Sequence, residues 1–173
     1  VAVVPDVAAL AARPDIDLVV VATPNAQHHP VARQALLAGK HVVVDKPFTL
    51  DAGQARELAE LARQRGRVLT VYQNRRWDAD FLTLRGLMAQ GAVGRPVFFE
   101  SHFDRYRPEV RERWREQAVP GAGLWVDLGS HLLDQALQLF GMPTAISADI
   151  AAQRDGAKVA DYFHVLLRYP KLR

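Results

Sequence analysis

Two groups of residues in this sequence combine charged and polar side chains in arrangements suited to acid–base chemistry. In the first group, Asp45 and Lys46 follow directly on the apolar run 41–44. An ion pair at the end of a buried strand is costly to desolvate, so a functional reason for it is expected. Pro47 restricts Lys46 to extended backbone conformations, which favours a lysine held in place for a bound group. A local ion pair at the surface is the alternative.

The second group is Asp127, His131 and Asp134, which are spaced i, i+4 and i+7. This spacing places the three side chains on roughly one face of a helix. A histidine one turn after an aspartate can act as a general acid or base, with the carboxylate orienting the imidazole. A polar helix face is the alternative. A metal site formed by His131, Asp134, His28 and His29 is a weaker alternative, since nothing in the sequence fixes the geometry of these side chains.

The elements that must position the first group alternate between strand and helix. Continuous β-branched runs at 17–23 and 41–45 indicate strands covered on both faces, and 67–72 is expected to be a third strand. Segments with helical spacing, 30–39 and 51–66, separate them. This order predicts right-handed crossovers and a parallel sheet.

Polar residues follow each of the three expected strands, at 23–29, 45–47 and 73–77. Ligands of open parallel sheets bind beyond the carboxyl ends of the strands. One polar strand end is usually a solvated loop, but three at the same edge favour a binding site.

The pattern changes after the third strand. The segment 78–90 has helical spacing, a long strand is expected at 97–106, and an amphipathic helix at 125–140 carries the second group. The segments 145–153 and 161–169 alternate as half-exposed antiparallel strands do.

The fold class that follows is α/β. A Rossmann-type parallel sheet, with its second half present, is expected over 1–73, followed over 74–173 by an α+β domain with a predominantly antiparallel open sheet. The chain opens in VAVV with no turn or cap and stops in YPKLR within a hairpin. We therefore expect it to be the middle of a longer protein.

Composition narrows the class of protein. Hydrophobic residues make up 49% of the 173, enough for one ordinary core or two smaller ones. The absence of cysteine excludes disulfides, thiolate zinc sites and cysteine nucleophiles. No apolar run approaches the ~20 residues of a membrane span, and the N-terminus does not resemble a signal peptide. A cytoplasmic protein with no membrane partner is expected.

The net charge is +3, and the densest cationic stretch is 105–115. Its arginines are interleaved with Glu109 and Glu112, so a solvated surface is the simplest interpretation. A surface that binds a phosphate or carboxylate is the alternative. No nucleic-acid-binding motif accompanies the stretch, and no nucleic-acid partner is expected.

Three stretches, 22–50, 72–88 and 120–141, together resemble the Gfo/Idh/MocA oxidoreductases. The ordered motifs are TPN-x-x-H, then DKP, then G-x-G-x-x-x-D-x-G-x-H, and the set is far more specific than any one of them. The DKPFT form, with NRRWD and DYFHV, is similar to the branch that contains NADP-dependent scyllo-inositol dehydrogenases. The resemblance covers essentially the whole chain. It implies hydride transfer between a nicotinamide cofactor and a ring hydroxyl of a sugar or cyclitol.

The resemblance also implies roles for particular residues. Lys46 matches the family lysine near the reacting hydroxyl, and Asp127 and His131 match its carboxylate and its general acid–base. Asn74 and Arg75 join these three as implied substrate-binding residues. The implied cofactor is NAD(P), with NADP favoured. The implied cofactor-binding residues are Thr23, Pro24, Asn25, His28, Asp45, Lys46, Pro47, Trp114 and Arg115.

The sequence departs from the family pattern in two respects. Asp45 stands where most members have glutamate, and no G-x-G-x-x-G fingerprint for the cofactor pyrophosphate occurs in the 173 residues. In the family this fingerprint precedes the matched region. A nucleotide-sensing regulator without catalysis and a structural protein on the same fold are the alternatives to an enzyme. The joint presence of Lys46, Asp127 and His131 favours the enzyme.

The expected strands 97–106, 145–153 and 161–169 would give the second domain a sheet with one face rich in Phe, Tyr and Val. Such a face on an enzyme usually meets a partner. We therefore expect a homo-oligomer formed through this C-terminal sheet, with a small polyol or sugar as substrate.

Overall fold

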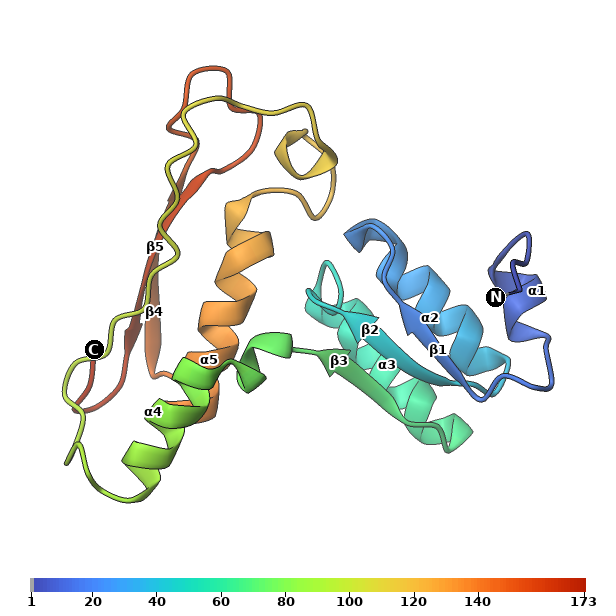
Figure 1. Ribbon diagram of the computed structural model, residues 1–173, viewed down its shortest axis with the longest axis horizontal. Helices are drawn as coiled ribbons and strands as arrows, with labels where there is room; N and C mark the ends of the chain where they lie inside the picture. The colour runs from blue at the N-terminus through green and yellow to red at the C-terminus, as the bar shows by residue number, and fades with distance from the viewer. Residues whose placement is uncertain (1) are drawn as a thin grey trace. The chain divides into compact units, whose positions relative to one another are not determined.

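The computed structural model of the chain describes residues 2–173. The chain divides into two compact units, Val1–Tyr72 and Gln73–Arg173, which we call unit 1 and unit 2. Unit 1 contains a parallel sheet with helices, and unit 2 contains an antiparallel pair of strands with helices (Figure 1). The predicted fold class is confirmed.

The sheet of unit 1 has three parallel strands in the order β1-β2-β3. Its elements in chain order are β1 (Leu18–Val21), α2 (His28–Leu37), β2 (His41–Asp45), α3 (Ala52–Arg65) and β3 (Leu69–Tyr72). Because the strands are parallel, the loops that follow β1 and β2 lie at the same edge of the sheet.

Helix α3 begins and ends where its sequence predicts. The Asp51 carboxylate accepts a hydrogen bond of 2.9 Å from the backbone N–H of Gln54, which satisfies an amide of the first turn. Gly66 has a φ of 60°, and this left-handed conformation ends the helix without the steric cost that a Cβ would add.

The core of unit 1 lies on one face of the sheet only. Val19, Val21, Val42 and Val44 are at most 4% exposed and pack against α2 and α3, as the cluster of buried residues shows. The alternate residues of β1 are exposed, Leu18 by 49% and Val20 by 64%. The prediction that these strands are covered on both faces is therefore wrong for the described residues. Two right-handed crossovers between successive strands place both helices on the same side.

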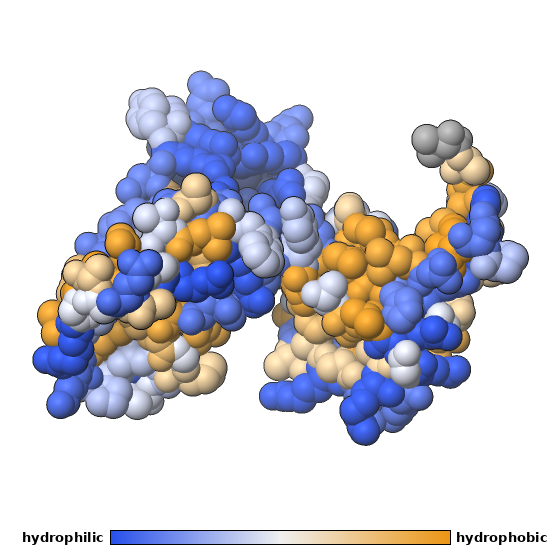
Figure 2. Space-filling view, turned by 60° about the horizontal axis from the view of Figure 1, so that its bottom comes forward, coloured by the Kyte–Doolittle hydropathy of each residue, from blue (hydrophilic) through white to orange (hydrophobic). Residues whose placement is uncertain are grey.

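The uncovered face of the sheet leaves apolar side chains on the surface of unit 1. Figure 2 shows apolar groups gathered on the surface of unit 1. Leu18, Val20 and Tyr72 are among its large exposed hydrophobic residues. Val43 of the central strand, which pairs with Val20, is half-buried on the same face.

A short helix near the start of the chain was not predicted. In α1 (Val7–Ala11), the Asp6 carboxylate accepts a hydrogen bond of 2.7 Å from the Ala9 amide. Five residues are too few to show a helical period in sequence.

Unit 2 combines helices with one antiparallel strand pair. A single turn, η2 (Asn74–Trp77), precedes α4 (Ala79–Ala89), and α5 (Ser130–Phe140) follows further along the chain. Strands β4 (Ala145–Ala151) and β5 (Tyr162–Arg168) pair antiparallel, as their alternation predicts. No helix among residues 2–173 is long and apolar enough to span a membrane.

The predicted long strand at 97–106 does not form. The Phe99 amide donates to the Arg173 carbonyl at 2.9 Å, and the Arg173 amide donates to the Val97 carbonyl at 3.2 Å. Within the described chain, no backbone–backbone hydrogen bond engages residues 100–106. The strand prediction is wrong here because an extended segment becomes a strand only when a neighbouring backbone supplies a continuous ladder.

The predicted helix at 125–140 consists of two parts. The first turn, η4 (Trp125–Gly129), is π-helical, and α5 follows it directly. A Cβ on Gly129 would lie 2.1 Å from Cε3 of Trp125, so the indole occupies the space that a side chain would need. The Trp125 ring also meets Phe163 of β5 at 5.3 Å between centroids. The π-helical turn thus places the Trp125 ring between Gly129 and Phe163 of β5.

Candidate functional site

The loop after β1 carries the TPN motif at the carboxyl edge of the sheet. Asn25, the first residue of the single helical turn η1 (Asn25–Gln27), is only 8% exposed. The Thr23 hydroxyl oxygen is buried and has no hydrogen-bond partner among residues 2–173. A buried hydroxyl without a partner is costly, so it marks a position where a polar ligand group would be stabilised.

The loop after β2 carries Asp45, Lys46 and Pro47. The Asp45 carboxylate accepts a hydrogen bond of 2.8 Å from the backbone N–H of Lys46. The Lys46–Pro47 peptide bond is cis. All three residues are half-buried. Asp45 therefore orders the backbone at the start of this loop, next to the lysine.

His28, predicted to lie on the cofactor side, is buried beneath these two loops. Its side chain is 1% exposed, with Nδ1 2.7 Å from the Pro47 carbonyl oxygen and Nε2 3.0 Å from the Thr23 carbonyl oxygen. The neighbouring His29 points elsewhere and pairs with Glu57 at 2.8 Å.

In unit 2, two predicted site residues meet on the ring of Phe103. The Arg75 guanidinium lies 4.8 Å from the ring centroid, and the His131 imidazole contacts the same ring edge-on at 6.5 Å. His131 is 5% exposed, and Asn74, next to Arg75 in η2, is half-buried. A cation over a ring face is favourable by about 0.5–2 kcal/mol. Sequence reasoning missed Phe103; its aromatic character within an extended segment was the available signal.

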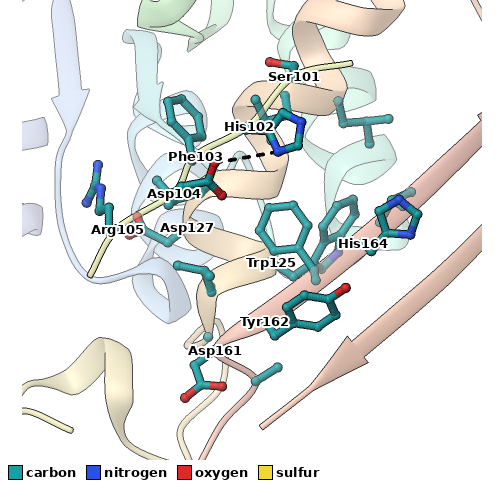
Figure 3. Close-up of a pocket in the computed structure, with 18 of the residues that line it drawn as sticks. Ser101, His102, Phe103, Asp104, Arg105, Trp125, Asp127, Asp161, Tyr162 and His164 are labelled. Atoms are coloured by element: carbon teal, nitrogen blue, oxygen red, sulfur yellow. Dashed lines mark ion pairs between the residues drawn. The ribbon is translucent and has the colours of Figure 1, made fainter. Parts of the chain in front are cut away.

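Asp127 lies at the wall of a cavity in unit 2. Its carboxylate is 3.5 Å from Nε of Arg115, whose guanidinium stacks on Trp114 at 4.6 Å. The cavity has a volume of about 1000 Å³ and is lined by residues of 98–108, η4, α5 and β5. Figure 3 shows Asp127 and Trp125 at this cavity, with the His102–Asp104 ion pair nearby. Of the predicted site residues, Asp127 and Arg115 are thus brought together here.

Asp134 has a different role from the one that its spacing suggested. Its two carboxylate oxygens accept hydrogen bonds of 2.6 and 2.7 Å from the Arg76 guanidinium. The hydrogen bond to Asp134 raises the pKa of Arg76 above its usual value. Gln135 of the same helix donates to the Arg75 carbonyl at 2.9 Å. Asp134 and Gln135 therefore attach η2, with Asn74 and Arg75, to α5.

The arginine-rich stretch is tied to a buried carboxylate rather than fully solvated. Glu116, 5% exposed, pairs with Arg113 at 2.6 Å and with Arg154 at 3.3 Å. Arg154 also pairs with Asp161 at 2.7 Å. Burial alone would raise the pKa of Glu116, but a backbone amide of Arg111 and the Arg113 guanidinium outweigh it and lower that pKa. The prediction of a solvated face is corrected for Arg113, because its partner Glu116 is buried and also pairs with Arg154.

The metal alternative finds no support in the described residues. No three His, Asp or Glu side chains of residues 2–173 gather as metal ligands would. His28 faces two backbone carbonyls, and Asp134 is held by Arg76.

Family models match almost the whole chain. Residues 1–73 match the oxidoreductase family with an NAD-binding Rossmann fold, and residues 81–172 match the GFO/IDH/MocA C-terminal domain. The chain therefore belongs to the GFO/IDH/MocA family of oxidoreductases.

Individual relatives agree with this assignment. Over 160 residues the chain is 61% identical to the oxidoreductase YdgJ of Escherichia coli and 46% identical to scyllo-inositol 2-dehydrogenase (NADP(+)) IolW of Bacillus subtilis. Each match covers 92% of this chain, but only 46% of YdgJ and 45% of IolW. An oxidoreductase structure from Yersinia pestis has a TM-score of 0.91 at 57% identity, over 98% of this chain and 48% of that one. The chain thus spans about half the length of these relatives.

Proposed function

We propose that the whole protein transfers hydride between NAD(P) and a secondary hydroxyl of a sugar or cyclitol. The observation that carries this proposal is the pair of loops at the carboxyl edge of the parallel sheet, with the buried Thr23 hydroxyl in one and Lys46 in the other. Such edges bind nucleotides in doubly wound folds. The 46% identity to IolW supports an inositol-like substrate and NADP as cofactor.

The residues present fit a nicotinamide cofactor. Thr23 offers a buried hydroxyl that lacks a protein partner among residues 2–173, and Asn25 is an amide at the same edge. We assign Thr23, Pro24, Asn25 and Lys46 to hold the cofactor in unit 1, with Trp114 and Arg115 in unit 2. When bound, NAD(P) accepts or supplies the hydride.

The chain's own residues would handle the proton and the developing charge. As the alcohol carbon loses hydride, its hydroxyl proton passes to His131, and a carbonyl group remains. Lys46 holds the hydroxyl oxygen and stabilises the negative charge that develops on it. Asp127 orients His131 or a neighbouring hydroxyl of the substrate, and Arg75 and Asn74 bind other hydroxyls of the ring.

The test is steady-state oxidation of a panel of cyclitols and sugars by the whole protein, followed as NAD(P)H absorbance across pH. Lys46→Met keeps the bulk of the stem but removes the charge, so turnover should fall about 10²–10³-fold. His131→Ala removes the proton acceptor, so the rate should fall roughly 10²–10⁴-fold and lose its pH dependence near neutrality.

Matched controls are Lys171→Met, at an exposed lysine, and His29→Ala, at a histidine paired with Glu57. Both should retain wild-type turnover. Near wild-type rates in Lys46→Met and His131→Ala would contradict the proposed mechanism. Cofactor binding with no oxidation of any polyol would instead favour a nucleotide-sensing protein.

The assembly proposal rests on the strand pair of unit 2. Every residue of β4 except Ala151 is exposed, with Ile146 exposed by 58% and Ile150 by 44%. Exposed apolar residues on an edge strand commonly meet a partner. We propose a homo-oligomer through this sheet, and a monomeric mass by light scattering at micromolar concentration would contradict it.

A further inference from the structure

His28 is placed to connect the two loops of the candidate cofactor site. It is the first residue of α2, and its imidazole is 1% exposed. Nδ1 lies 2.7 Å from the Pro47 carbonyl oxygen in the loop after β2, and Nε2 lies 3.0 Å from the Thr23 carbonyl oxygen in the loop after β1. One ring therefore spans both strand ends.

The burial of His28 argues against direct contact with a ligand. At 1% exposure the ring has almost no surface to offer, and both ring nitrogens already face protein oxygens. A backbone carbonyl can only accept hydrogen bonds, so the ring nitrogen that carries the proton donates to the carbonyl of one loop, and the ring packs against the carbonyl of the other. Its influence on a bound molecule must pass through the backbones of Thr23 and Pro47.

Those two backbones adjoin the residues assigned to the chemistry. Lys46 directly precedes Pro47, and Thr23 carries the buried hydroxyl that lacks a protein partner among residues 2–173. A displacement of about 1 Å at a reacting group can cost 10²-fold in rate. Fixing the Pro47 carbonyl therefore fixes the base of the Lys46 side chain.

We propose that His28 is a positioning residue that holds the loop of Lys46 against the loop of Thr23, and does not itself contact the cofactor. This inference rests on the proposed function for its effect on catalysis. Its structural part, the tie between the two loops, stands on the geometry of unit 1 alone.

The first measurement needs no activity. In the whole protein, His28→Ala should speed amide hydrogen exchange in residues 46–50, while the exchange of α3 stays unchanged. His29→Ala is the matched control, because His29 is the adjacent residue and pairs with Glu57 outside both loops. Unchanged exchange at 46–50 in His28→Ala would overturn the proposal.

The second measurement is a double-substitution cycle on turnover. His28→Ala should lower kcat by about 10²-fold in the wild type but by less than about threefold in the Lys46→Met background, since both changes act through one ammonium group. Equal losses in the two backgrounds would show that His28 does not act through Lys46. If the wild type oxidised no polyol, the proposed function would fail while the exchange experiment still decided the loop contact.

A second, more conservative variant separates the positioning role of His28 from a general loss of the fold. His28→Gln keeps an N–H donor that can reach one carbonyl, so its exchange rate at 46–50 and its kcat should lie between those of wild type and His28→Ala. If both variants lost the fold, His28 would be a general stability residue and the positioning role would be overturned.

Discussion

Unit 1 buries a continuous layer of aliphatic side chains, whereas unit 2 buries, besides apolar residues such as Phe81 and Leu128, a carboxylate that is paired with arginines. The core of unit 1 joins Val21, Val44, Leu36 and Leu58, all at most 1% exposed. In unit 2, Glu116 is buried at the centre of contacts with Arg113 and Arg154.

The difference matters because the two kinds of contact respond to different changes. Burial of apolar surface is non-directional and independent of pH, so it tolerates small shifts of a helix on a sheet. Ion pairs that exclude water need exact geometry and the right protonation state. The region around Glu116 in unit 2 therefore depends on charge, whereas the core of unit 1 depends on volume.

The largest effect is expected from Leu58→Ala. Leu58 is 0% exposed in the core of unit 1, so removing its side chain should lower the free energy of unfolding by about 2–5 kcal/mol. Hydrogen exchange should accelerate in β1 to β3 much more than in α5. Leu87→Ala, at a residue 41% exposed, is the control and should change little. A similar loss in both variants would contradict the volume argument for unit 1.

Glu116→Gln should destabilise unit 2 by about 3 kcal/mol, because Arg113 and Arg154 would lose a shared buried partner. Chemical unfolding followed by exchange in β5 and residues 111–117 measures this change. Glu112→Gln, at an exposed residue in the same stretch, should have no effect. If Glu116→Gln and Glu112→Gln had the same stability, the buried carboxylate of Glu116 would not be what stabilises residues 111–117.

Gly129→Ala should cost unit 2 about 1–3 kcal/mol, because the new Cβ would lie 2.1 Å from the Trp125 ring. Gly86→Ala in α4 is the matched control, since no heavy atom lies within 4 Å of a Cβ there. That control should stabilise the protein by up to about 1 kcal/mol. Melting temperatures of the two variants should move in opposite directions.

Acid should loosen unit 2 before unit 1. Burial opposes the charge of Asp161, but hydrogen bonds from Gln153 and Arg154 outweigh it and lower its pKa, as contacts lower that of Glu116. A carboxyl with a lowered folded pKa stabilises the fold above its ordinary pKa, near about 4, and loses this contribution as pH falls through the folded value. Exchange measured from pH 6 down to pH 3 should therefore accelerate first around residues 111–117 and 153–161.

The smallest effect is expected at the surface ion pair of α3. Arg63 pairs with Glu60 at 2.6 Å, but both side chains are largely exposed, at 76% and 48%. Arg63→Gln should leave the melting temperature unchanged within error, since solvent screens such pairs. A marked loss would mean that charge supports unit 1 as well.

Much of unit 1 could be predicted from sequence because its signals are local. Asp51 and Gly66 delimit α3 through contacts within one turn. The one-sided cover of the sheet could not be read from β-branched runs, since a run of valines looks the same whether one face or two are covered. The side of the sheet on which each helix lies follows from the strand order β1-β2-β3 together with the right-handed crossovers, and the runs do not show the strand order.

In unit 2 the site depends on contacts distant in sequence. The π-helical turn at 125–129 and the pairing of Asp134 with Arg76, 58 residues away, follow from packing rather than from spacing. Glu116 likewise meets Arg154 across 38 residues. The predicted roles of Lys46, Asp127 and His131 came from motif resemblance and remain predictions for the experiments above.

The packing of Trp125 has a consequence for the fluorescence of the protein. All three tryptophans of the sequence, Trp77, Trp114 and Trp125, lie in unit 2. Trp77 is 69% exposed and should emit at long wavelength, whereas Trp125, against Gly129 and Phe163, should emit further to the blue. Tryptophan fluorescence, excited at the indole band, therefore reports on unit 2 alone, and no added label is needed to follow the unfolding of that unit.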